Sequence, residues 1–417
     1  MGEWKTVRVG DLAASGSNAM ATGPFGSAIS SRYFRTAGVP VIRGGNLSTD
    51  SGVRLNDKEG LVFLEPIKAD EFSRSKVRRG DLIFTCWGTI NQIGLIDASA
   101  RYPEYVISNK QMKLTPNPQL ADSEFLYYLF SSPELQSEIL EGSIGSSIPG
   151  FNLTRLRSLI LNIPPLDEQH QIAAMLRDAE LVENRARVMT SKRREIRQGM
   201  VQELLSGRTR LPGFGDQWPE VSLASVTTGL RGSGLSKERL DTVGLYPCLL
   251  YGELFTTYGR RIDRVRSRTS SAASVQSKAG DVLVPGSTTT VARDLATASA
   301  LHVSGVLVGG DTNIIRPGPS VDSDWLAYYI THQLRDRIAE VAQGLTIKHL
   351  YVRDLLQCAI LLPPIAEQRA IVGALSDVEE DISALGRRVE KARVVKNGMM
   401  QELLTGRTRL PVTGAVA

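Results

Sequence analysis

The chain has 417 residues, of which 42% are hydrophobic and 22% are charged, and its formal net charge at pH 7 is +5. This length suits two to four globular domains, and the basic balance permits a polyanionic partner without requiring one. No apolar run approaches the roughly 18 residues that a membrane-spanning helix needs, and the N-terminus lacks a signal-peptide core. Three widely scattered cysteines favour a reducing compartment, so we expect a cytoplasmic protein.

The chain repeats itself at a distance of 199 residues. The sequence PPLDEQ at residues 164–169 returns as PPIAEQ at 363–368, and QELLSGRTRLP at 202–212 returns as QELLTGRTRLP at 401–411. Over residues 164–212, 22 of the 49 positions are identical to those 199 later, without a gap. Such a repeat predicts two copies of one structural unit and a pseudo-twofold chain.

The repeat divides the chain into four segments. Two long segments, residues 1–160 and 213–360, are rich in Gly, Ser, Thr and Val and carry short alternating runs bounded by turn residues. This pattern predicts two small α/β or mainly β domains. The shorter segments, residues 161–212 and 361–417, contain the repeated motifs and are expected to be helical.

Each repeated motif is predicted to open and close a long helix. The proline pair at 164–165 suits a helix start, and Asp167 and Glu168 would lie in the first turn, where the helix dipole favours negative charge. Gly207 and Gly406 would end the two helices in a left-handed conformation. Some forty helical residues would make a rod roughly 60 Å long.

Apolar residues recur by threes and fours along both predicted helices, which is typical of a coiled-coil seam. A single helix of this length cannot bury such a stripe alone. We therefore expect an α+β fold in which two long antiparallel coiled-coil helices separate two globular domains; packing of each helix on its own domain, or on another chain, is the alternative. The expected seam residues are Ile172, Met175, Ala179, Val182, Ala186, Met189, Ile196 and Met200, and Ile371, Leu375, Val378, Ile382, Leu385, Val389, Ala392, Met399 and Leu403.

Motifs of catalytic and cofactor-binding proteins are missing from the sequence. There is no phosphate-binding loop, no dinucleotide fingerprint after a strand and no nucleophile elbow. None of the four histidines stands at metal-ligand spacing to another His or Cys. We therefore expect no catalytic centre, no metal and no nucleotide site.

Polar, basic and aromatic residues near turn signals form the candidate DNA-binding set. Arg and Lys can read guanine, Asn and Gln can read adenine, and small hydroxyls can bind phosphate. Each residue alone is better explained as solvated surface, but two divergent loop sets on one duplicated frame favour recognition. In the first domain the candidates are Arg32, Arg35, Arg43, Asn46, Trp87, Thr89, Asn91, Lys110 and Gln111. In the second domain they are Arg231, Lys237, Tyr251, Arg260, Arg261, Thr288, Thr289, Arg293 and Lys348.

The order of these parts resembles the specificity (S) subunit of type I restriction–modification systems. The motif P-P-x-x-E-Q, about thirty helical residues and then Q-E-L-L-[ST]-G-R-T-R-L-P are present twice. GPFGS at residues 23–27 and VIRGGNL at 41–47 extend the likeness in the first domain. The second domain has RGSG at 231–234 and LYGE at 250–253 in their place.

This resemblance implies a DNA-sequence-recognition subunit without chemistry of its own. Each globular domain would read one half of a bipartite double-stranded DNA site, and the helical rod would set the spacer between the halves. The helices would also dock two modification (methyltransferase) subunits, which flip and methylate adenine, and restriction/translocase subunits would join that core. S-adenosylmethionine, ATP and Mg²⁺ would lie on these partner subunits, with no cofactor on this chain and no membrane partner.

Three other interpretations remain open from the sequence. The chain could be the S subunit of a combined type II-like enzyme with one fused nuclease–methylase partner, which the co-purifying chains would reveal. It could be a coiled-coil scaffold for proteins, which should bind no duplex specifically, whereas a DNA reader should lose affinity steeply with salt. A stand-alone enzyme is disfavoured by the missing motifs.

Overall fold

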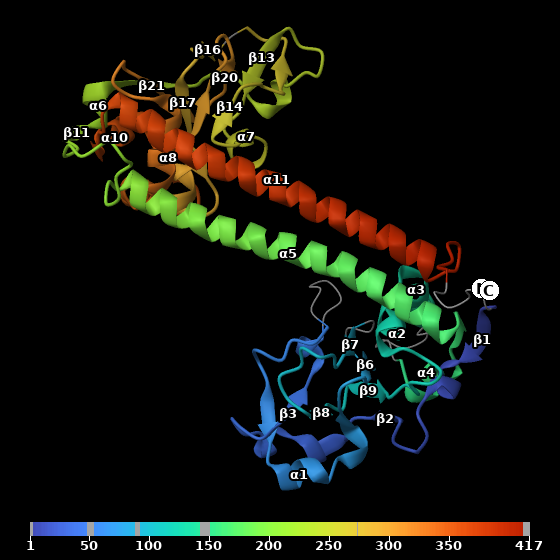
Figure 1. The fold of residues 1–417 in the computed structure, drawn as a ribbon. Coiled ribbons are helices and arrows are strands. Elements are labelled where there is room, and N and C mark those ends of the chain that lie inside the picture. The colour runs from blue at the N-terminus through green and yellow to red at the C-terminus, as the bar shows by residue number, and fades with distance from the viewer. Residues whose placement is uncertain (1–2, 48–53, 88–91, 142–150, 273, 412–417) are drawn as a thin grey trace. The chain divides into compact units, whose positions relative to one another are not determined.

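The computed structural model of the chain describes residues 3–47, 54–87, 92–141, 151–272 and 274–411. The chain forms two compact units, each described by itself below (Figure 1). The first unit comprises residues 1–188 with 386–417, and the second unit comprises residues 189–385.

Two long helices confirm the prediction made from the repeat. They are α5 (Leu166–Leu205) and α11 (Ile365–Leu403). One part of each helix belongs to the first unit and the other part to the second unit. Gly207 and Gly406 follow them with φ angles of 72° and 73°, in the left-handed region that terminates a helix.

The described residues of the first unit contain two small sheets. One joins β2 (Met20–Thr22), β9 (Gln111–Leu114), β6 (Leu82–Thr85) and β7 (Ile93–Leu95), in that order and all antiparallel. The other joins β4 (Val62–Leu64), β3 (Val39–Ile42), β8 (Tyr105–Ile107) and β5 (Lys76–Val77), with β3 and β8 parallel. A separate antiparallel pair joins β1 (Lys5–Arg8) to β10 (Ile160–Ile163), just before α5.

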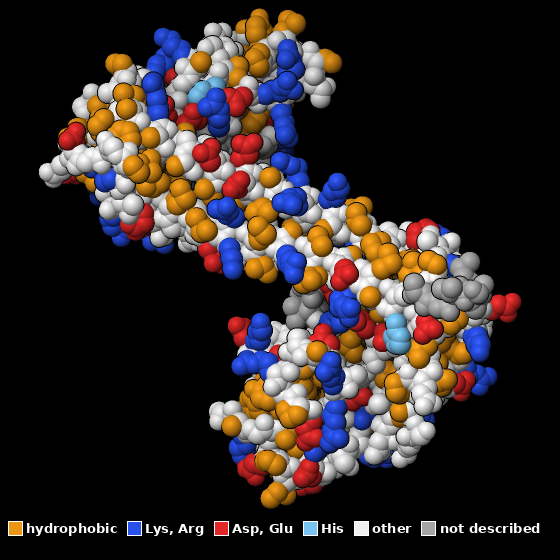
Figure 2. Space-filling view, viewed as in Figure 1, with side chains coloured by type: hydrophobic (Ala, Val, Ile, Leu, Met, Phe, Trp, Pro, Cys, Tyr) orange, Lys and Arg blue, Asp and Glu red, His pale blue; other side chains and the backbone are white. Residues whose placement is uncertain are grey.

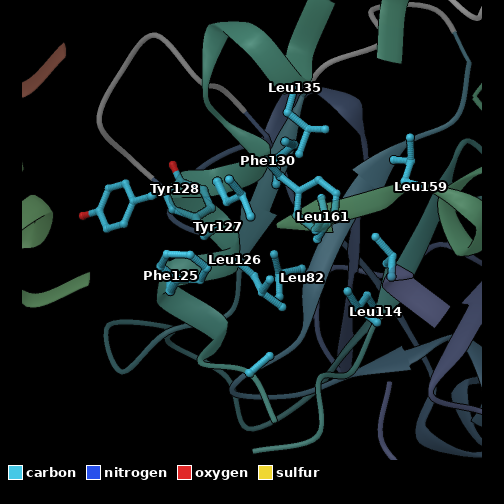
Figure 3. Close-up of a cluster of buried hydrophobic side chains, with 14 of the residues drawn as sticks. Leu82, Leu114, Phe125, Leu126, Tyr127, Tyr128, Phe130, Leu135, Leu159 and Leu161 are labelled. Carbon is cyan, nitrogen blue, oxygen red and sulfur yellow. The ribbon is translucent and has the colours of Figure 1, made fainter. Parts of the chain in front are cut away.

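Short helices complete the first unit, and its core lies where one of them covers the first sheet. Figure 3 shows aromatic side chains of α2 gathered with leucines from the strands, and Phe125, Phe130 and Leu82 are fully buried. Burial of each such side chain contributes about 1.5–3 kcal/mol. The helices are α1 (Pro66–Asp70), α2 (Ser123–Phe130), α3 (Pro133–Glu141) and α4 (Leu153–Ser158), and the 3₁₀ helices are η1 (Val9–Leu12), η2 (Gly26–Ile29), η3 (Ser31–Tyr33), η4 (Gly44–Asn46) and η5 (Ser73–Ser75).

The second unit repeats this plan with five strands in its first sheet in place of four. One sheet joins β12 (Thr227–Arg231), β21 (Thr312–Pro317), β17 (Asp281–Pro285), β19 (Ser299–Leu301) and β14 (Arg261–Ile262), in that order. The other joins β15 (Arg268–Thr269), β13 (Tyr246–Leu249), β20 (Leu307–Val308) and β16 (Val275–Gln276). Two short antiparallel pairs join β11 (Glu220–Ser222) to β23 (Ala359–Leu361) and β18 (Ser287–Thr288) to β22 (Lys348–His349).

The helices of the second unit occupy corresponding places. Asp122 caps α2 by accepting the N–H of Phe125 at 2.7 Å, and Asp322 caps α8 by accepting the N–H of Trp325 at 3.0 Å. The helices are α6 (Leu223–Val226), α7 (Glu253–Thr256), α8 (Ser323–His332), α9 (Arg335–Val341) and α10 (Val352–Leu356), with the 3₁₀ helices η6 (Lys237–Arg239) and η7 (Ala292–Ala296).

The glutamine of the P-P-x-x-E-Q motif joins the start of each long helix to its globular unit. Gln169 accepts the N–H of Asp122 at 2.9 Å and donates to the carbonyl of Pro164 at 2.9 Å. Gln368 accepts the N–H of Asp322 at 2.7 Å and donates to the carbonyl of Pro363 at 2.8 Å. The side-chain amides of both glutamines are buried, so the glutamine of this motif has a structural role in the described fold.

The glutamate of the same motif pairs with the arginine of the other repeat's R-T-R-L-P sequence. In the first unit Arg409 donates to both oxygens of Glu168, at 2.8 and 2.7 Å. In the second unit Arg210 donates to both oxygens of Glu367, at 2.6 Å each, and Trp218 Nε1 donates to the same carboxylate at 2.9 Å. We call these two pairs the crossed pairs, because each joins the first repeat to the second.

Within each unit the two long helices run antiparallel, as predicted. In the first unit Lys396 of α11 forms an ion pair with Glu183 of α5 at 2.8 Å. In the second unit Arg197 of α5 donates to Glu379 of α11 at 2.7 Å. In each contact, a residue from the second half of one helix thus meets a residue from the first half of the other.

The prediction of a continuous apolar seam is wrong in part. Met175, Val182 and Ile196 are 41%, 59% and 48% exposed, whereas Glu183 and Thr190 are buried at 3% and 6% exposure. Figure 2 accordingly shows hydrophobic side chains at the surface along the long helices. The physical reason is that each helix divides its apolar residues between its partner helix, a globular core and solvent.

A second interaction fastens each globular unit to a long helix, and we call it the helix clamp. In the first unit it consists of Arg54, Tyr128 and Glu180: the arginine donates to the tyrosine hydroxyl at 2.7 Å and to the carboxylate at 3.1 Å. The tyrosine hydroxyl itself donates to Glu180 at 2.9 Å. Burial, the largest influence, together with Glu180 raises the pKa of Tyr128, so the hydroxyl keeps its proton.

The helix clamp of the second unit consists of Arg260, Tyr328 and Glu379. Arg260 donates to Glu379, and its guanidinium carbon lies 4.3 Å from the centre of the Tyr328 ring. Burial by itself would raise the pKa of Glu379, but Arg260 and then Arg197 outweigh it and hold that pKa below its ordinary value.

Removal of one hydroxyl from the first helix clamp tests its contribution to stability. We expect Tyr128→Phe to lower the free energy of unfolding by about 1–3 kcal/mol, because Arg54 and Glu180 lose a buried hydrogen-bond partner. Urea denaturation of the full chain measures this loss. The matched control is Tyr127→Phe, because the hydroxyl of this neighbouring residue makes no hydrogen bond within the described part of the chain; an equal loss in both variants would contradict the clamp.

The first crossed pair predicts a dependence of stability on pH. The hydrogen bonds from Arg409 outweigh burial and lower the pKa of Glu168 in the folded chain below its ordinary value of about 4.3. The pair therefore stabilises fully above about pH 4.3, and the stabilisation is lost as the pH falls further. We expect Glu168→Gln to unfold more easily than wild type at pH 7 and to converge with it in acid. Asp167→Asn, at the exposed neighbouring position, should run parallel to wild type.

Candidate nucleic-acid interface

In the first unit, the ends of several strands meet at one edge, which we call the first strand-end edge. It carries Arg43 after β3, Trp87 after β6, and the turn from Ser108 to Lys110 between β8 and β9. The N–H of Ser108 donates to the carbonyl of Ile42 at 3.0 Å, and the N–H of Cys86 donates to the carbonyl of Lys110 at 2.7 Å. These bonds bring three predicted DNA contacts, Arg43, Trp87 and Lys110, to one place.

The first glycine of GPFGS permits a close approach of two backbones at this edge. A Cβ at Gly23 would stand 1.8 Å from the carbonyl oxygen of Ser108, which no side chain could tolerate. In the second unit a Cβ at Gly232 would stand 2.0 Å from the carbonyl oxygen of Gly309. The RGSG sequence of the second domain therefore occupies the place of GPFGS, which its letters alone did not reveal.

The exposed side chains of the first strand-end edge are an aromatic ring and two cations. Trp87 is 48% exposed, and Lys110 is exposed as well. Arg43 is exposed and donates to the carbonyl of Gly60 at 2.9 Å, which leaves other guanidinium N–H groups available. An apolar face beside cations suits contact with bases and phosphates.

Two predicted contacts of the first unit are buried and hold loops in place. Asn46 is 4% exposed; it accepts the N–H of Arg43 at 2.9 Å and donates to the carbonyl of Asn56 at 2.9 Å. Gln111 is fully buried and accepts the N–H of Ser108 at 3.0 Å, while its Nε2 atom has no hydrogen-bond partner in the described part of the chain. Both residues position the first strand-end edge from beneath.

The remaining candidates of the first unit lie elsewhere or outside the description. Arg35 pairs with β4 on its outer side and donates to Glu65 at 2.8 Å. Arg32 donates to the hydroxyl of Tyr33 at 2.7 Å, on the same side. Thr89 and Asn91 lie outside the described residues.

The second strand-end edge corresponds to the first and carries a different set of side chains. Arg231, at the end of β12, forms an ion pair with Asp311 at 2.7 Å, and its guanidinium carbon lies 5.7 Å from the centre of the Tyr351 ring. Thr288 of β18 stands opposite Lys348 of β22. Arg231 thus lies in the five-stranded sheet, while Thr288, which is buried, and Lys348, which is half-buried, lie in the short pair β18–β22.

Asp311 is the residue at this edge that the sequence analysis missed. Its φ angle is +54°, and it is the one non-glycine residue with positive φ among those described. Such a conformation is uncommon for a side-chain-bearing residue and is often found where function requires it. Asp311 occupies the turn before β21, as Lys110 occupies the turn before β9. The preceding Gly309-Gly310 pair indicates a turn in the sequence, but no sequence pattern indicates the ion pair between Asp311 and Arg231.

The other candidates of the second unit are dispersed. Arg260 belongs to the second helix clamp, and Arg261 pairs with Asp324 at 2.8 Å at the far strand of the sheet. Arg293 of η7 pairs with Asp336 at 2.7 Å. Lys237 is exposed at the start of η6, and Tyr251 and Thr289 are half-buried and exposed loop residues, respectively.

Two further features bear on the described residues, a metal-ligand group and a membrane-spanning helix. These residues contain no group of three or more His, Cys, Asp or Glu side chains that could hold a metal ion. Within the same residues, no helix combines the length and the apolar character needed to cross a membrane.

Comparison with known proteins defines the class to which this fold belongs. Residues 1–186 and 216–391 each match the family described as type I restriction modification DNA specificity domain. The chain therefore belongs to the family of type I restriction–modification DNA specificity proteins. The two matches agree with the duplicated frame seen in the two units.

Individual relatives and solved structures agree with this class. A putative type I restriction enzyme MjaX specificity subunit of Methanocaldococcus jannaschii is 23% identical over 396 residues, which cover 89% of this chain and 88% of the relative. The type I restriction enzyme EcoBI specificity subunit of Escherichia coli is 28% identical over 122 residues, covering 28% of this chain and 25% of the relative. The type I restriction–modification S subunit from M. genitalium has a similar fold, with a TM-score of 0.57, 13% identity and 96% of each chain covered.

Proposed function

We propose that this chain is the DNA-sequence-recognition subunit of a type I restriction–modification complex, in which each unit reads one half of a bipartite duplex site. The observation that carries the proposal is the repeated frame with its two strand-end edges. Equivalent backbone hydrogen bonds hold both edges, yet the exposed side chains on them differ. One frame with two different polar surfaces supports recognition of two different short sequences.

The side chains at both edges belong to types that bind duplex DNA. Arg231 can offer parallel N–H groups to guanine, and Asp311 can accept the amino group of cytosine. Trp87 offers an apolar face, while Arg43 and Lys110 can neutralise phosphates. The antiparallel pair of α5 and α11 sets the spacer between the two half-sites.

The chain performs no chemistry of its own in this proposal. S-adenosylmethionine, ATP and Mg²⁺ bind to partner subunits, which methylate adenine and translocate DNA, and none of them binds here. We place the complex in the cytoplasm. The buried free thiols of Cys86, Cys248 and Cys358 support a reducing compartment.

The docking surface for modification subunits lies on the exposed apolar part of the long helices. In the first unit a groove of about 400 Å³ lies between α5 and α11, and we call it the docking groove. Met175, Val182 and Val395 in this groove are 41%, 59% and 49% exposed. Apolar surface of this kind is typical of a protein–protein interface, and its full lining is Met175, Asp178, Ala179, Val182, Ala392, Val395 and Met399.

Genome-wide mapping of adenine methylation, in cells with and without this chain, tests the recognition function. We expect a split motif, two short defined halves around a fixed undefined gap, that disappears when the chain is deleted. Exchange of residues 1–160 for those of another family member should change one half only. Unchanged methylation on deletion, or a change in both halves on exchange, would contradict the proposal.

Single substitutions sharpen the same assay. Lys110→Gln is expected to weaken or relax one half of the motif, and Arg231→Gln the other half, because the two residues lie on different strand-end edges. The matched control is Arg261→Gln, since Arg261 is exposed and pairs with Asp324 away from the edge. Equal effects of all three variants would indicate general electrostatic binding.

The docking groove predicts which substitutions release the modification subunits. We expect Val182→Asp combined with Val395→Asp to abolish co-elution with those subunits in size-exclusion chromatography, because charges would replace buried apolar contact. Both positions are exposed in the isolated chain, so its circular dichroism should not change. Val243→Asp, at a site 85% exposed in the second unit, is the control that should leave the complex intact.

A further inference from the structure

A pocket in the second unit carries more basic residues than the second helix clamp uses. It has a volume of about 820 Å³ and lies between α5, α11 and the segment joining α8 to α9. We call it the arginine pocket. Its charged and titratable lining residues are Arg194, Arg197, Arg260, His332, Arg335 and Glu379.

The arginine pocket holds more positive charge than its acidic residues can balance. Its lining includes four arginines and one carboxylate, Glu379, to which both Arg197 and Arg260 donate. Arg335 reaches its nearest acidic partner, Asp294, only at 3.9 Å. Arginines gathered around a cavity repel one another, so the arrangement costs free energy unless an anion fills it.

The first unit provides an internal comparison, because it has a pocket at the corresponding place. This pocket of about 540 Å³ is lined by Lys396, Asn397 and Gln401, which stand 199 residues after Arg197, Gln198 and Gln202 of the arginine pocket.

The two pockets differ in charge. The first-unit pocket also contains Glu134 and Glu180, and its Lys396 is paired with Glu183 at 2.8 Å. The same frame is thus built without excess positive charge in the first unit. Arg197 and Arg260 hold Glu379, whereas the fold does not require Arg194 and Arg335, which are exposed at the same pocket.

We propose that the arginine pocket binds a phosphate group. Planar guanidinium groups offer paired N–H donors that match phosphate oxygens, and several of them around one cavity favour a multiply charged anion. The phosphate can belong to the DNA backbone or to a free polyphosphate compound. Both sources share this chemistry, and the proposal does not rest on the DNA-reading function.

His332 lies in the arginine pocket and reports on its charge. Burial is the main cause that lowers its pKa to about 4, and Arg260, Arg197 and Arg335 lower it further, while Glu379 opposes them. A bound phosphate would add negative charge beside this ring and raise its pKa. The chain has only four histidines, so a spectrum of ¹³C-labelled imidazoles resolves each one.

The experiment is a titration of the full-length chain with inorganic pyrophosphate, followed by NMR of ¹³Cε1-labelled histidine at constant ionic strength. The His332 signal is assigned with His332→Gln. We expect this signal to move saturably, with an increase in the pKa of the ring. The combined variant Arg194→Gln with Arg335→Gln, at two exposed positions, should bind at least tenfold more weakly. Arg393→Gln, 199 residues after Arg194 and outside the pocket, is the matched control and should bind as wild type does.

A second titration on the chain already bound to duplex DNA distinguishes the two sources of phosphate. If DNA prevents the pyrophosphate response, the backbone occupies the arginine pocket. If the response persists, the ligand is a free phosphate compound. A His332 signal that does not move with pyrophosphate, or that moves equally in the double arginine variant, overturns the proposal. Failure of DNA reading alone would leave the pyrophosphate response intact.

Discussion

The crossed pairs are the interaction on which the rest of this structure depends. Glu168 and Glu367 are fully buried, and a buried carboxylate is tolerated only when an opposite charge and hydrogen bonds compensate it. Each carboxylate finds its arginine, Arg409 or Arg210, in the other repeat. Neither unit can therefore be completed from one repeat alone. The same pairing sets the antiparallel direction of α5 and α11, because it joins the start of one helix to the segment that follows the other.

The duplicated frame lets the two units diverge where side chains are exposed. Close backbone approaches at Gly23 and Gly232 hold both strand-end edges in the same way, whereas one edge presents Trp87 and the other presents Arg231 with Asp311. The pockets beside the long helices diverge similarly, one without excess positive charge and one rich in arginine. Backbone geometry shared by the two units, with different exposed side chains, is what a protein with two separate recognition tasks requires.

Particular residues show how far sequence reasoning reached. The long helices and their glycine ends were predictable, because a proline pair and a left-handed glycine act locally. The antiparallel pairing was expected from two matched apolar stripes, and the crossed pairs show what sets its direction. The seam was mispredicted at Val182. The spacing of apolar residues shows that they share one face of the helix, but it does not show whether the partner helix, a globular core or solvent covers that face. Arg260 and Arg231 were both predicted as DNA contacts because each is an arginine near turn residues. In the structure Arg260 completes the second helix clamp, whereas Arg231 lies at the second strand-end edge. Their partners, Glu379 and Asp311, are distant in sequence.

The sequence by itself determined that this chain is built twice, that each copy opens and closes a long helix, and that it belongs with the specificity subunits of restriction–modification systems. These properties depend on local spacing and on motif identity, which can be read along one dimension. Only the tertiary structure decided which carboxylate neutralises which arginine, and therefore which basic residues remain free to bind an anion. Ion pairing depends on distances of a few ångströms between segments far apart in the chain, and no local pattern encodes those distances.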